Sequence, residues 1–243
     1  MFRFSFVFVM GAAVAAGCSA SPTGPTGERG RVATLSRTRF LAFGDSMTAG
    51  EVTSPAGSGI LTSAKQVLVP AASYPSVLHS HLTIRYAAQS SSIVVTNAGK
   101  SAEHAHEGVR RFIDTFAATQ PEAVLLLEGA NSLWLYGTDL PTLALGQMVD
   151  VAQAGGARVF VATQPPTRPG LSHSQPLDQL LSFNRKITEM AAIKGVALVN
   201  LYDSMLPEAA TLIGRDGLHP TEAGYRRMAE VFFNAIRAEL ETR

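Results

Sequence analysis

Five short apolar runs, each separated from the next by a segment long enough to hold a helix, constrain the fold of this chain most strongly. The run Ala-Val-Leu-Leu-Leu between Glu122 and Glu128 has no polar residue, which makes it the best candidate for a central strand. Parallel strands are covered on both faces and carry continuous apolar runs of this kind. Strands that alternate with helices are joined by right-handed crossovers, which place helices on both faces. The sequence therefore predicts an α/β fold, a three-layer α/β/α sandwich around a five-stranded parallel sheet. The predicted strands are residues 40–43, 92–96, 122–128, 158–163 and 196–199.

The segments between these runs carry helix signals. Ser101 is expected to cap one helix and Thr221 to cap the last one, because serine and threonine side chains accept hydrogen bonds from the first free amides of a helix. The predicted helices are residues 74–82, 101–118, 141–154, 177–193 and 221–239. A long insertion follows the first strand over residues 51–73 and contains one short strand or extended piece at residues 66–70.

The amino-terminal residues differ from the rest of the chain. Arg3 precedes an apolar segment, residues 4–16, which is too short to span a bilayer as a helix and is typical of a signal peptide over residues 1–17. The small residues before Cys18 resemble the lipobox of bacterial lipoproteins, although Ala15 stands where leucine is usual. A lone cysteine is often a buried structural thiol, but one that ends a signal segment has no core around it, so we expect Cys18 to be lipidated.

Residues 18–37 consist mainly of Ser, Pro, Thr, Gly and Arg and cannot bury enough apolar surface to offset the entropy of ordering. We predict a lipidated flexible tether there, followed by one domain over residues 38–243. The protein is then expected to be exported and held by its lipid on a membrane of the bacterial cell envelope, at the outer membrane or cell surface, with the domain in the aqueous phase. The formal net charge of +1 and the absence of like-charge runs give no electrostatic footprint for nucleic acid. No protein partner is predicted.

Polar or small residues follow three of the predicted strands, at the edge where parallel strands bring their carboxyl ends together. Ser46 follows the first strand, Gly99 the second and Asn131 the third, and a loop with Asp216 and His219 precedes the last helix. A serine nucleophile needs a base within hydrogen-bond reach and a group that orients the base, and one tight loop can supply both. A glycine N–H, a side-chain amide and the serine's own N–H are suitable donors for an oxyanion. Taken singly, each residue could be an ordinary turn, cap or loop residue; their joint occurrence favours catalysis.

Over about residues 39–240 the chain resembles the SGNH hydrolases, also called the GDSL esterase/lipase family. The four motifs of that family occur in order as Gly44-Asp45-Ser46, Asn97-Ala98-Gly99, Gly129-Ala130-Asn131 and Asp216-Gly217-Leu218-His219-Pro220.

The resemblance implies a flavodoxin-like SGNH hydrolase fold, with Ser46 as nucleophile, His219 as general base and Asp216 as the carboxylate that orients it. It also implies an oxyanion hole made by the backbone N–H groups of Ser46 and Gly99 and the side chain of Asn131. Two positions depart from the pattern: Ser132 stands where Asp is usual, and Met47 replaces the common leucine. Neither change removes a catalytic group, but Ser132 leaves open what orients the Asn131 amide.

The histidines outside this constellation do not predict a metal site. His104 and His106 are two apart on a predicted helix and should face different ways, and the same holds for His79 and His81. His173 lies alone in a loop. We predict no metal and no cofactor.

The predicted activity is that of a serine esterase that hydrolyses carboxylic esters through an acyl-serine, with short-chain or O-acetyl esters as the expected substrates. Trp134 and Tyr136 follow Asn131 closely and could line a substrate pocket, although aromatic residues at a helix start more often pack into the core. Small-molecule, carbohydrate and lipid esters all remain open. Two alternatives stay open as well: an O-acyltransferase of the cell envelope on the same scaffold, and a lipoprotein that binds ligands without catalysis.

Overall fold

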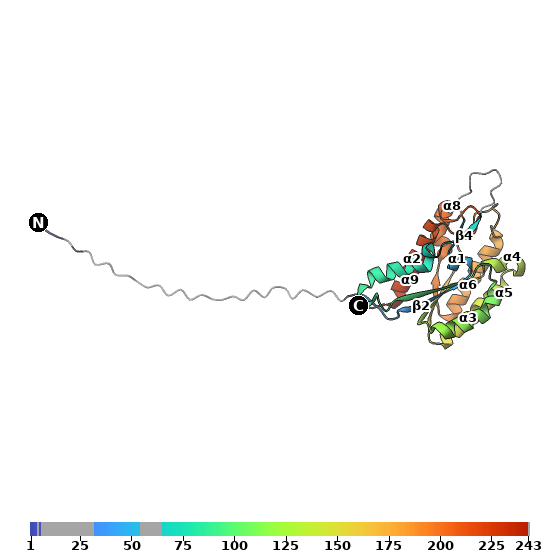
Figure 1. Cartoon of the computed structure of the whole chain (residues 1–243), viewed down its shortest axis with the longest axis horizontal. Coiled ribbons are helices and arrows are strands. Elements are labelled where there is room, and N and C mark those ends of the chain that lie inside the picture. Colours follow the sequence, from blue (N-terminus) through green and yellow to red (C-terminus); the bar gives the residue numbers. More distant parts are fainter. Residues whose placement is uncertain (4, 6–31, 54–64, 243) are drawn as a thin grey trace. The chain divides into compact units, whose positions relative to one another are not determined.

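The computed structural model describes residues 1–3, 5, 32–53 and 65–242. The chain divides into two units, Met1–Arg31 and Val32–Arg243, and the second is the folded domain (Figure 1). Cys18, most of the predicted signal peptide and most of the predicted tether lie outside the described residues. In the described part of the chain, no helix is both long and apolar enough to cross a membrane.

A five-stranded parallel sheet forms the centre of the domain, as predicted. Its strands lie in the order β5-β2-β6-β7-β8, so the first strand of the sheet in sequence, β2, is flanked by the second and the third. The residues Phe40 to Phe43 of β2 and all of β6 are almost completely buried, which explains their unbroken apolar sequence. The strands are β2 (Arg39–Gly44), β5 (Val94–Gly99), β6 (Ala123–Leu127), β7 (Arg158–Ala162) and β8 (Ala197–Val199).

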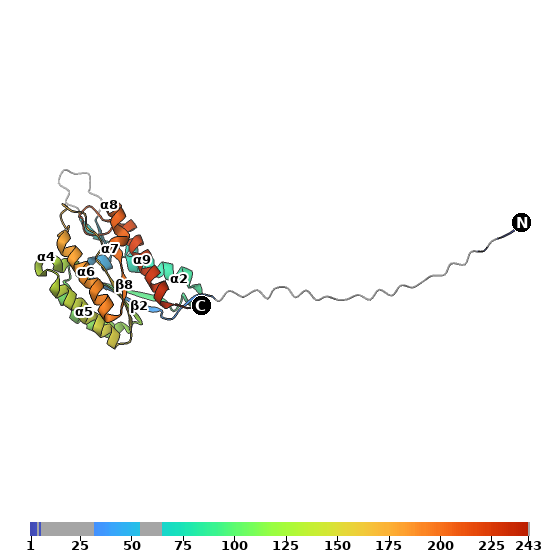
Figure 2. The same cartoon turned by 180° about the vertical axis from the view of Figure 1, so that it is seen from behind.

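Helices cover both faces of this sheet and complete the predicted three layers. Phe40 and Ala42 belong to the core beneath α2 and α9, whereas Leu41 and Phe43 belong to the core beneath α3, α5 and α6. Figures 1 and 2 show α2 and α9 together on one side of the sheet and α5 and α6 on the other. The long helices are α2 (Tyr74–Arg85), α3 (Ala105–Thr119), α5 (Asp139–Ala154), α6 (Leu177–Lys194) and α9 (Glu222–Leu240). Short helices are α1 (Ser46–Ala49), α4 (Leu133–Tyr136), α7 (Leu201–Met205) and α8 (Ala209–Leu212), with single 3₁₀ turns η1 (Pro70–Ala72), η2 (Ala87–Gln89), η3 (Ala130–Ser132) and η4 (Leu206–Glu208).

One helix start differs from its prediction. Ser101 was expected to cap a helix, but α3 begins at Ala105, and the side chain of Ser101 instead donates a hydrogen bond to Glu51. Ala102 adopts a left-handed φ of 59°, which interrupts the helical conformation between Ser101 and α3. Thr221 does cap α9 as predicted, since its hydroxyl accepts a hydrogen bond from the Gly224 N–H at 3.1 Å.

The insertion after the first strand contains an antiparallel hairpin. Strands β3 (Glu51–Thr53) and β4 (Gln66–Leu68) pair with each other, and β4 confirms the extended piece expected at residues 66–70. Residues 54–64 lie outside the described chain.

The domain begins earlier than predicted. Strand β1 (Thr34–Leu35) pairs antiparallel with β9 (Glu241–Thr242). The folded unit therefore includes the last residues of the predicted tether, residues 18–37. The Leu35 side chain is buried, and its N–H donates to the Gln89 side chain at 2.7 Å. The folded unit therefore begins before the boundary predicted at residue 38, because β9, which follows α9, pairs with β1, and the local composition does not reveal that pairing.

Candidate active site

Ser46 is the first residue of α1 and lies directly beyond the carboxyl end of β2. Asp45 caps this one-turn helix by accepting a hydrogen bond from the Met47 N–H at 3.0 Å. The preceding glycine is required by packing, since a Cβ at Gly44 would lie 1.8 Å from the Leu127 carbonyl oxygen of β6. The tight contact between β2 and β6 thus fixes where the Ser46 side chain emerges.

Ser46, His219 and Asp216 form one continuous hydrogen-bonded chain. The Nε2 atom of His219 lies 2.9 Å from Ser46 Oγ, and its Nδ1 atom lies 2.5 Å from Asp216 Oδ2. All three side chains are buried, with Ser46 3% and His219 4% exposed. The geometry is that of a nucleophile, a base and an orienting carboxylate. These are the three side chains that the sequence assigned to those places.

The loop between α8 and α9 holds Asp216 in place with its own backbone. The N–H groups of Leu218 and His219 both donate to Asp216 Oδ1 at 3.1 Å, which leaves Oδ2 for the imidazole. Gly217 has a φ of 89°, a left-handed conformation that glycine adopts without strain. Burial acts to raise the pKa of Asp216, but these hydrogen bonds and the nearby charge of His219 outweigh it and lower the pKa. Asp216 is therefore ionised at neutral pH and orients the ring.

Asn131 lies in η3, immediately beyond the central strand. Its amide nitrogen donates to the Glu103 carbonyl oxygen at 3.0 Å, and a primary amide has a second proton left to donate. The Ser132 hydroxyl instead accepts from the Ala105 N–H at 3.0 Å, at the start of α3. The backbone of Glu103, not the residue after Asn131, is thus what orients the amide.

Gly99 lies at the end of β5, beside α1, but its N–H is already engaged. The N–H donates to the Asn97 side-chain oxygen at 2.9 Å. A Cβ at Gly99 would lie 2.0 Å from the Ala49 nitrogen, so packing against α1 is enough to require glycine there.

Ala102, with its left-handed φ, directly precedes Glu103, whose carbonyl oxygen accepts from the Asn131 amide. The sequence offered no signal for Ala102, because a left-handed alanine cannot be recognised from its residue type.

Glu51 is a further side chain at this site that sequence reasoning missed. Its Oε2 atom lies 3.5 Å from His219 Nε2, and its Oε1 atom accepts the hydrogen bond from Ser101. His173, expected to be isolated, has its ring centroid 6.4 Å from that of His219. Both come from segments flanking the site, the β3–β4 hairpin and the loop before α6.

Two buried carboxyl groups lie close behind the nucleophile. Burial raises the pKa of Asp45 to about 6, against the opposing effects of the Met47 hydrogen bond and the His219 charge. Burial, followed by repulsion from Asp45 and Glu103, raises the pKa of Glu128 well above its usual value. Glu103 is paired with Arg111, whose guanidinium also donates to the Ala98 and Gly44 carbonyl oxygens at 2.7 and 3.2 Å. This pair ties the carboxyl ends of β5 and β2 together beneath the site.

The predicted pocket residues Trp134 and Tyr136 lie on α4, which follows η3, and are 60% and 41% exposed. The Tyr136 ring packs edge-on against His104 and His106, with centroid distances of 5.2 and 4.7 Å. These two histidine rings lie stacked at 5.9 Å, so the expectation that they face different ways is wrong: His104 precedes α3 rather than belonging to it. Among the described residues, no group of three or more His, Cys, Asp or Glu side chains is placed to hold a metal ion.

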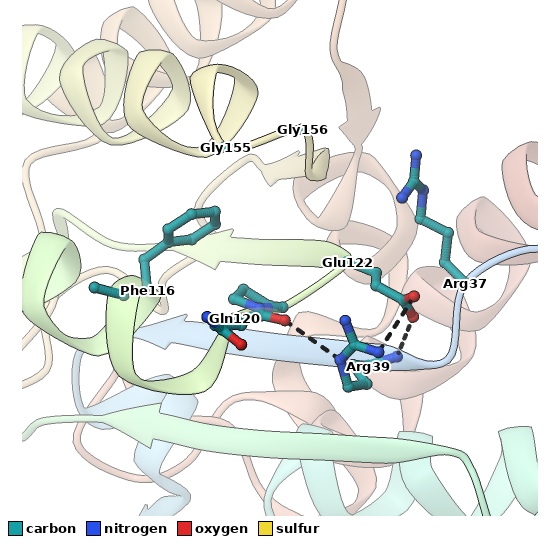
Figure 3. Close-up of a pocket in the computed structure, with 9 residues that line it drawn as sticks. Arg37, Arg39, Phe116, Gln120, Glu122, Gly155 and Gly156 are labelled. Carbon is teal, nitrogen blue, oxygen red and sulfur yellow. Dashed lines mark hydrogen bonds and ion pairs between the residues drawn. The ribbon is translucent and has the colours of Figure 1, made fainter.

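A pocket of about 670 Å³ lies at the opposite edge of the sheet, where β2 and β6 begin (Figure 3). Arg39 and Glu122 form an ion pair at 3.4 Å there, and Phe116 and Gly155 form part of the wall. Its lining contains no serine, cysteine or histidine. The serine and histidine suited to nucleophilic chemistry lie instead at the carboxyl edge of the sheet, at Ser46 and His219.

The domain is similar to a known protein family and to several solved structures. The sequence profile of the GDSL-like lipase/acylhydrolase family matches residues 42–227, which include Ser46, Asn131, Asp216 and His219. No curated protein matched the sequence.

Solved structures with the same fold include three bacterial proteins. A lipase/acylhydrolase from Enterococcus faecalis has a TM-score of 0.70 and 20% identity, and the alignment covers 85% of this chain and 98% of that chain. An acetylxylan esterase from Geobacillus stearothermophilus has a TM-score of 0.65 and 19% identity over 83% of this chain and 94% of that one. A psychrotrophic esterase from Pseudoalteromonas sp. has a TM-score of 0.61 and 22% identity over 82% and 96%. At these identities the likeness establishes the fold.

Proposed function

The chain belongs to the GDSL-like lipase/acylhydrolase family, and from that premise we propose that it is a serine esterase that hydrolyses carboxylic esters through an acyl-serine intermediate. The observation that carries the proposal is the hydrogen-bonded chain from Ser46 through His219 to Asp216, with distances of 2.9 and 2.5 Å. A serine with only a structural role in a turn does not require a histidine beside it that is oriented by a buried carboxylate.

In the proposed reaction, His219 Nε2 takes the proton from Ser46 Oγ while Oγ bonds to the ester carbonyl carbon. The carbonyl π electrons move to the carbonyl oxygen and return when the bond to the leaving alcohol breaks, and the alcohol leaves with the proton from His219. Water then attacks the acyl-serine, gives its proton to His219, and the acid is released as Ser46 regains its proton. Asp216 stays ionised throughout and stabilises the imidazolium.

The oxyanion would be stabilised by the Ser46 N–H and the free proton of the Asn131 amide. Gly99 can join them only if its N–H gives up the bond to Asn97. The N–H of Ala102 is a second candidate for the third donor. Ala102 directly precedes Glu103, whose carbonyl oxygen accepts a hydrogen bond from the Asn131 amide.

We further propose short-chain or O-acetyl esters as substrates. The support is the burial of the nucleophile and the base, since the residues Ser46 and His219 are 3% and 4% exposed. A small acyl group reaches Ser46 Oγ with less rearrangement than a long chain.

The test is turnover of 4-nitrophenyl esters of graded acyl length. We expect Ser46→Ala to abolish turnover and to abolish labelling by a serine-directed fluorophosphonate. Ser80→Ala, which removes an exposed serine of α2, is the matched control and should behave as the wild type. Full turnover in Ser46→Ala would overturn the proposal. Product analysis with added alcohol or sugar acceptors separates hydrolysis from acyl transfer.

A further inference from the structure

Glu51 is a carboxylate held beside the nucleophile and the base. It is the first residue of β3 and follows Gly50, the left-handed residue that ends α1. Its Oε2 atom lies 3.5 Å from His219 Nε2, the same nitrogen that lies 2.9 Å from Ser46 Oγ. The side chain is 17% exposed, so it borders the site without being sealed from solvent.

The position of Glu51 is fixed by contacts on several sides. Its backbone carbonyl oxygen accepts a hydrogen bond at 2.6 Å from the hydroxyl of Tyr225, a buried residue of α9. Its backbone pairs with Leu68 of β4, and its Oε1 atom accepts the hydroxyl proton of Ser101. A carboxylate on a freely moving surface loop would have none of these constraints.

The charges around Glu51 leave its Oε2 atom available. Within the described chain, His219 is the one basic side chain that approaches it as an ion-pair partner. The other nearby carboxylates have their own partners: Asp216 is bonded to the far side of the His219 ring, and Glu103 is paired with Arg111. Oε2 can therefore accept a hydrogen bond from a ligand, and a carboxylate at neutral pH can only accept.

The leaving alcohol of an ester would lie beside this carboxylate. For His219 to return its proton, the ester oxygen has to lie next to Nε2, and Glu51 Oε2 is a side-chain acceptor 3.5 Å from that nitrogen. Two further hydrogen-bonding side chains lie near: Ser101 donates to Glu51, and the His173 ring has its centroid 6.4 Å from that of His219. The alcohol side of the site is thus polar and carries a fixed negative charge.

We propose that Glu51 is a specificity-determining residue that selects esters whose alcohol part carries a hydroxyl group next to the scissile oxygen, as in esters of polyols. The hydroxyl donates to Glu51 Oε2 while the ester oxygen faces His219. An alkyl alcohol of the same size leaves the carboxylate partly desolvated without a donor, and an anionic alcohol is repelled. The inference rests on the proposed esterase function and adds the class of alcohol to it.

The test compares two acetates of nearly equal size, 2-hydroxyethyl acetate and propyl acetate, hydrolysed by the full chain. Each kcat/KM is divided by the rate of the same ester in dilute alkali, which removes the difference in intrinsic reactivity. Hydrogen bonds to charged acceptors suggest a wild-type preference of about 10-fold or more for the hydroxyl-bearing ester. We expect Glu51→Gln, which keeps an acceptor oxygen without the charge, to retain part of this preference, and Glu51→Met to abolish it.

Glu189→Gln, which removes an exposed carboxylate of α6, is the matched control and should keep the wild-type preference. A wild type without preference overturns the inference whatever the variants do. An unchanged preference in Glu51→Met, or an equal loss on both acetates, also overturns it, because the carboxylate would then only support the fold. Turnover of 4-nitrophenyl acetate that depends on Ser46 keeps the esterase proposal standing in each of these cases.

Discussion

Asp45, next to the nucleophile, is a buried residue whose pKa is raised by its surroundings. Its carboxyl is completely buried, one oxygen accepts from Met47, and the other has no hydrogen-bond partner among the described residues. Burial disfavours the ionised form of such a carboxyl more than the protonated form, which is why burial raises its pKa to about 6. The charge of this capping residue therefore changes near pH 6.

This residue predicts a measurable pH dependence of stability. Because the folded pKa of about 6 lies above the usual 3.8, the stabilisation from protonated Asp45 is fully present below pH 3.8 and is lost as the pH rises through 6. At neutral pH the free energy of unfolding of the wild type should therefore be about 3 kcal/mol lower than that of Asp45→Asn. This variant keeps an acceptor for the Met47 N–H and cannot ionise.

Denaturant unfolding at pH 4 and pH 7.5 measures this difference. We expect the two proteins to have similar free energies of unfolding at pH 4 and Asp45→Asn to be the more stable at pH 7.5. Asp114→Asn, at a side chain that is 62% exposed, should show no such divergence. A wild type as stable as Asp45→Asn at pH 7.5 would contradict the prediction.

Asn131 is the residue whose substitution we expect to lower kcat while leaving KM nearly unchanged. Its amide is oriented by the Glu103 carbonyl oxygen, and we propose that its other proton is donated to the developing oxyanion. Asn131→Ala is expected to lower kcat by about 10²- to 10³-fold, with little change in KM, because the interaction strengthens only in the transition state. Steady-state kinetics on 4-nitrophenyl acetate measure both constants. A wild-type kcat would remove Asn131 from the oxyanion hole.

At the scale of elements, the active site depends on how closely α1 packs against β5. The two backbones approach so tightly that a Cβ at Gly99 would lie 2.0 Å from the Ala49 nitrogen and 2.6 Å from the Thr48 carbonyl carbon. Both contacts are to backbone, so no side-chain rotation can relieve them. The helix that carries Ser46 would have to move instead.

Gly99→Ala should therefore destabilise the domain and lower esterase activity together, with a loss of about 1–3 kcal/mol, as overpacking usually costs. Gly146→Ala in α5 is the matched control: the nearest atoms to its new Cβ are side-chain atoms at 3.5 and 3.7 Å. That variant should be as stable as the wild type or more so, because alanine favours the helix. Thermal unfolding and 4-nitrophenyl acetate turnover measure the two effects. Equal stability and activity of Gly99→Ala and Gly146→Ala would show that the approach of α1 to β5 is not restrictive.

At the scale of the whole molecule, the two ends of the domain meet. Arg85 and Tyr86 donate hydrogen bonds at 2.7 Å to Glu241, in the strand that pairs with β1. The pKa of Glu241 falls to about 2 because of the hydrogen bonds from Arg85 and Tyr86. The chain thus enters the domain beside its carboxyl-terminal strand, and Ser46, Asp216 and His219 lie at the other edge of the sheet.

The amino-terminal sequence adds a prediction about where the protein acts. We propose that the chain is exported and lipidated at Cys18. If so, the full chain, expressed in a bacterium, is labelled by radioactive palmitate and found with the membranes. Cys18→Ser should lose the label, whereas Ser46→Ala should keep it, because lipidation does not depend on the protein's own activity. A label that persists in Cys18→Ser would contradict lipidation at that residue.

The sequence by itself determined the sheet and the three side chains of the hydrogen-bonded chain. Side chains on both faces of β2 and β6 are buried, so these strands have continuous apolar sequences that can be recognised locally. Parallel strands also bring the residues that follow them to one edge of the sheet. Ser46, Asn131, Asp216 and His219 could therefore be chosen from motif and position alone. The α9 cap at Thr221 was equally readable, because capping is a local interaction.

Only the tertiary structure decided which groups from distant segments reach these residues. Glu51 meets His219 and Ser101 because the β3–β4 hairpin and the turn before α3 approach the same edge, and no local pattern records that approach. The stacking of His104 on His106 and the pairing of β1 with β9 depend likewise on contacts that the residue types do not specify. Patterns of burial and capping are set within a few residues, whereas a meeting of side chains depends on how the crossovers orient whole elements.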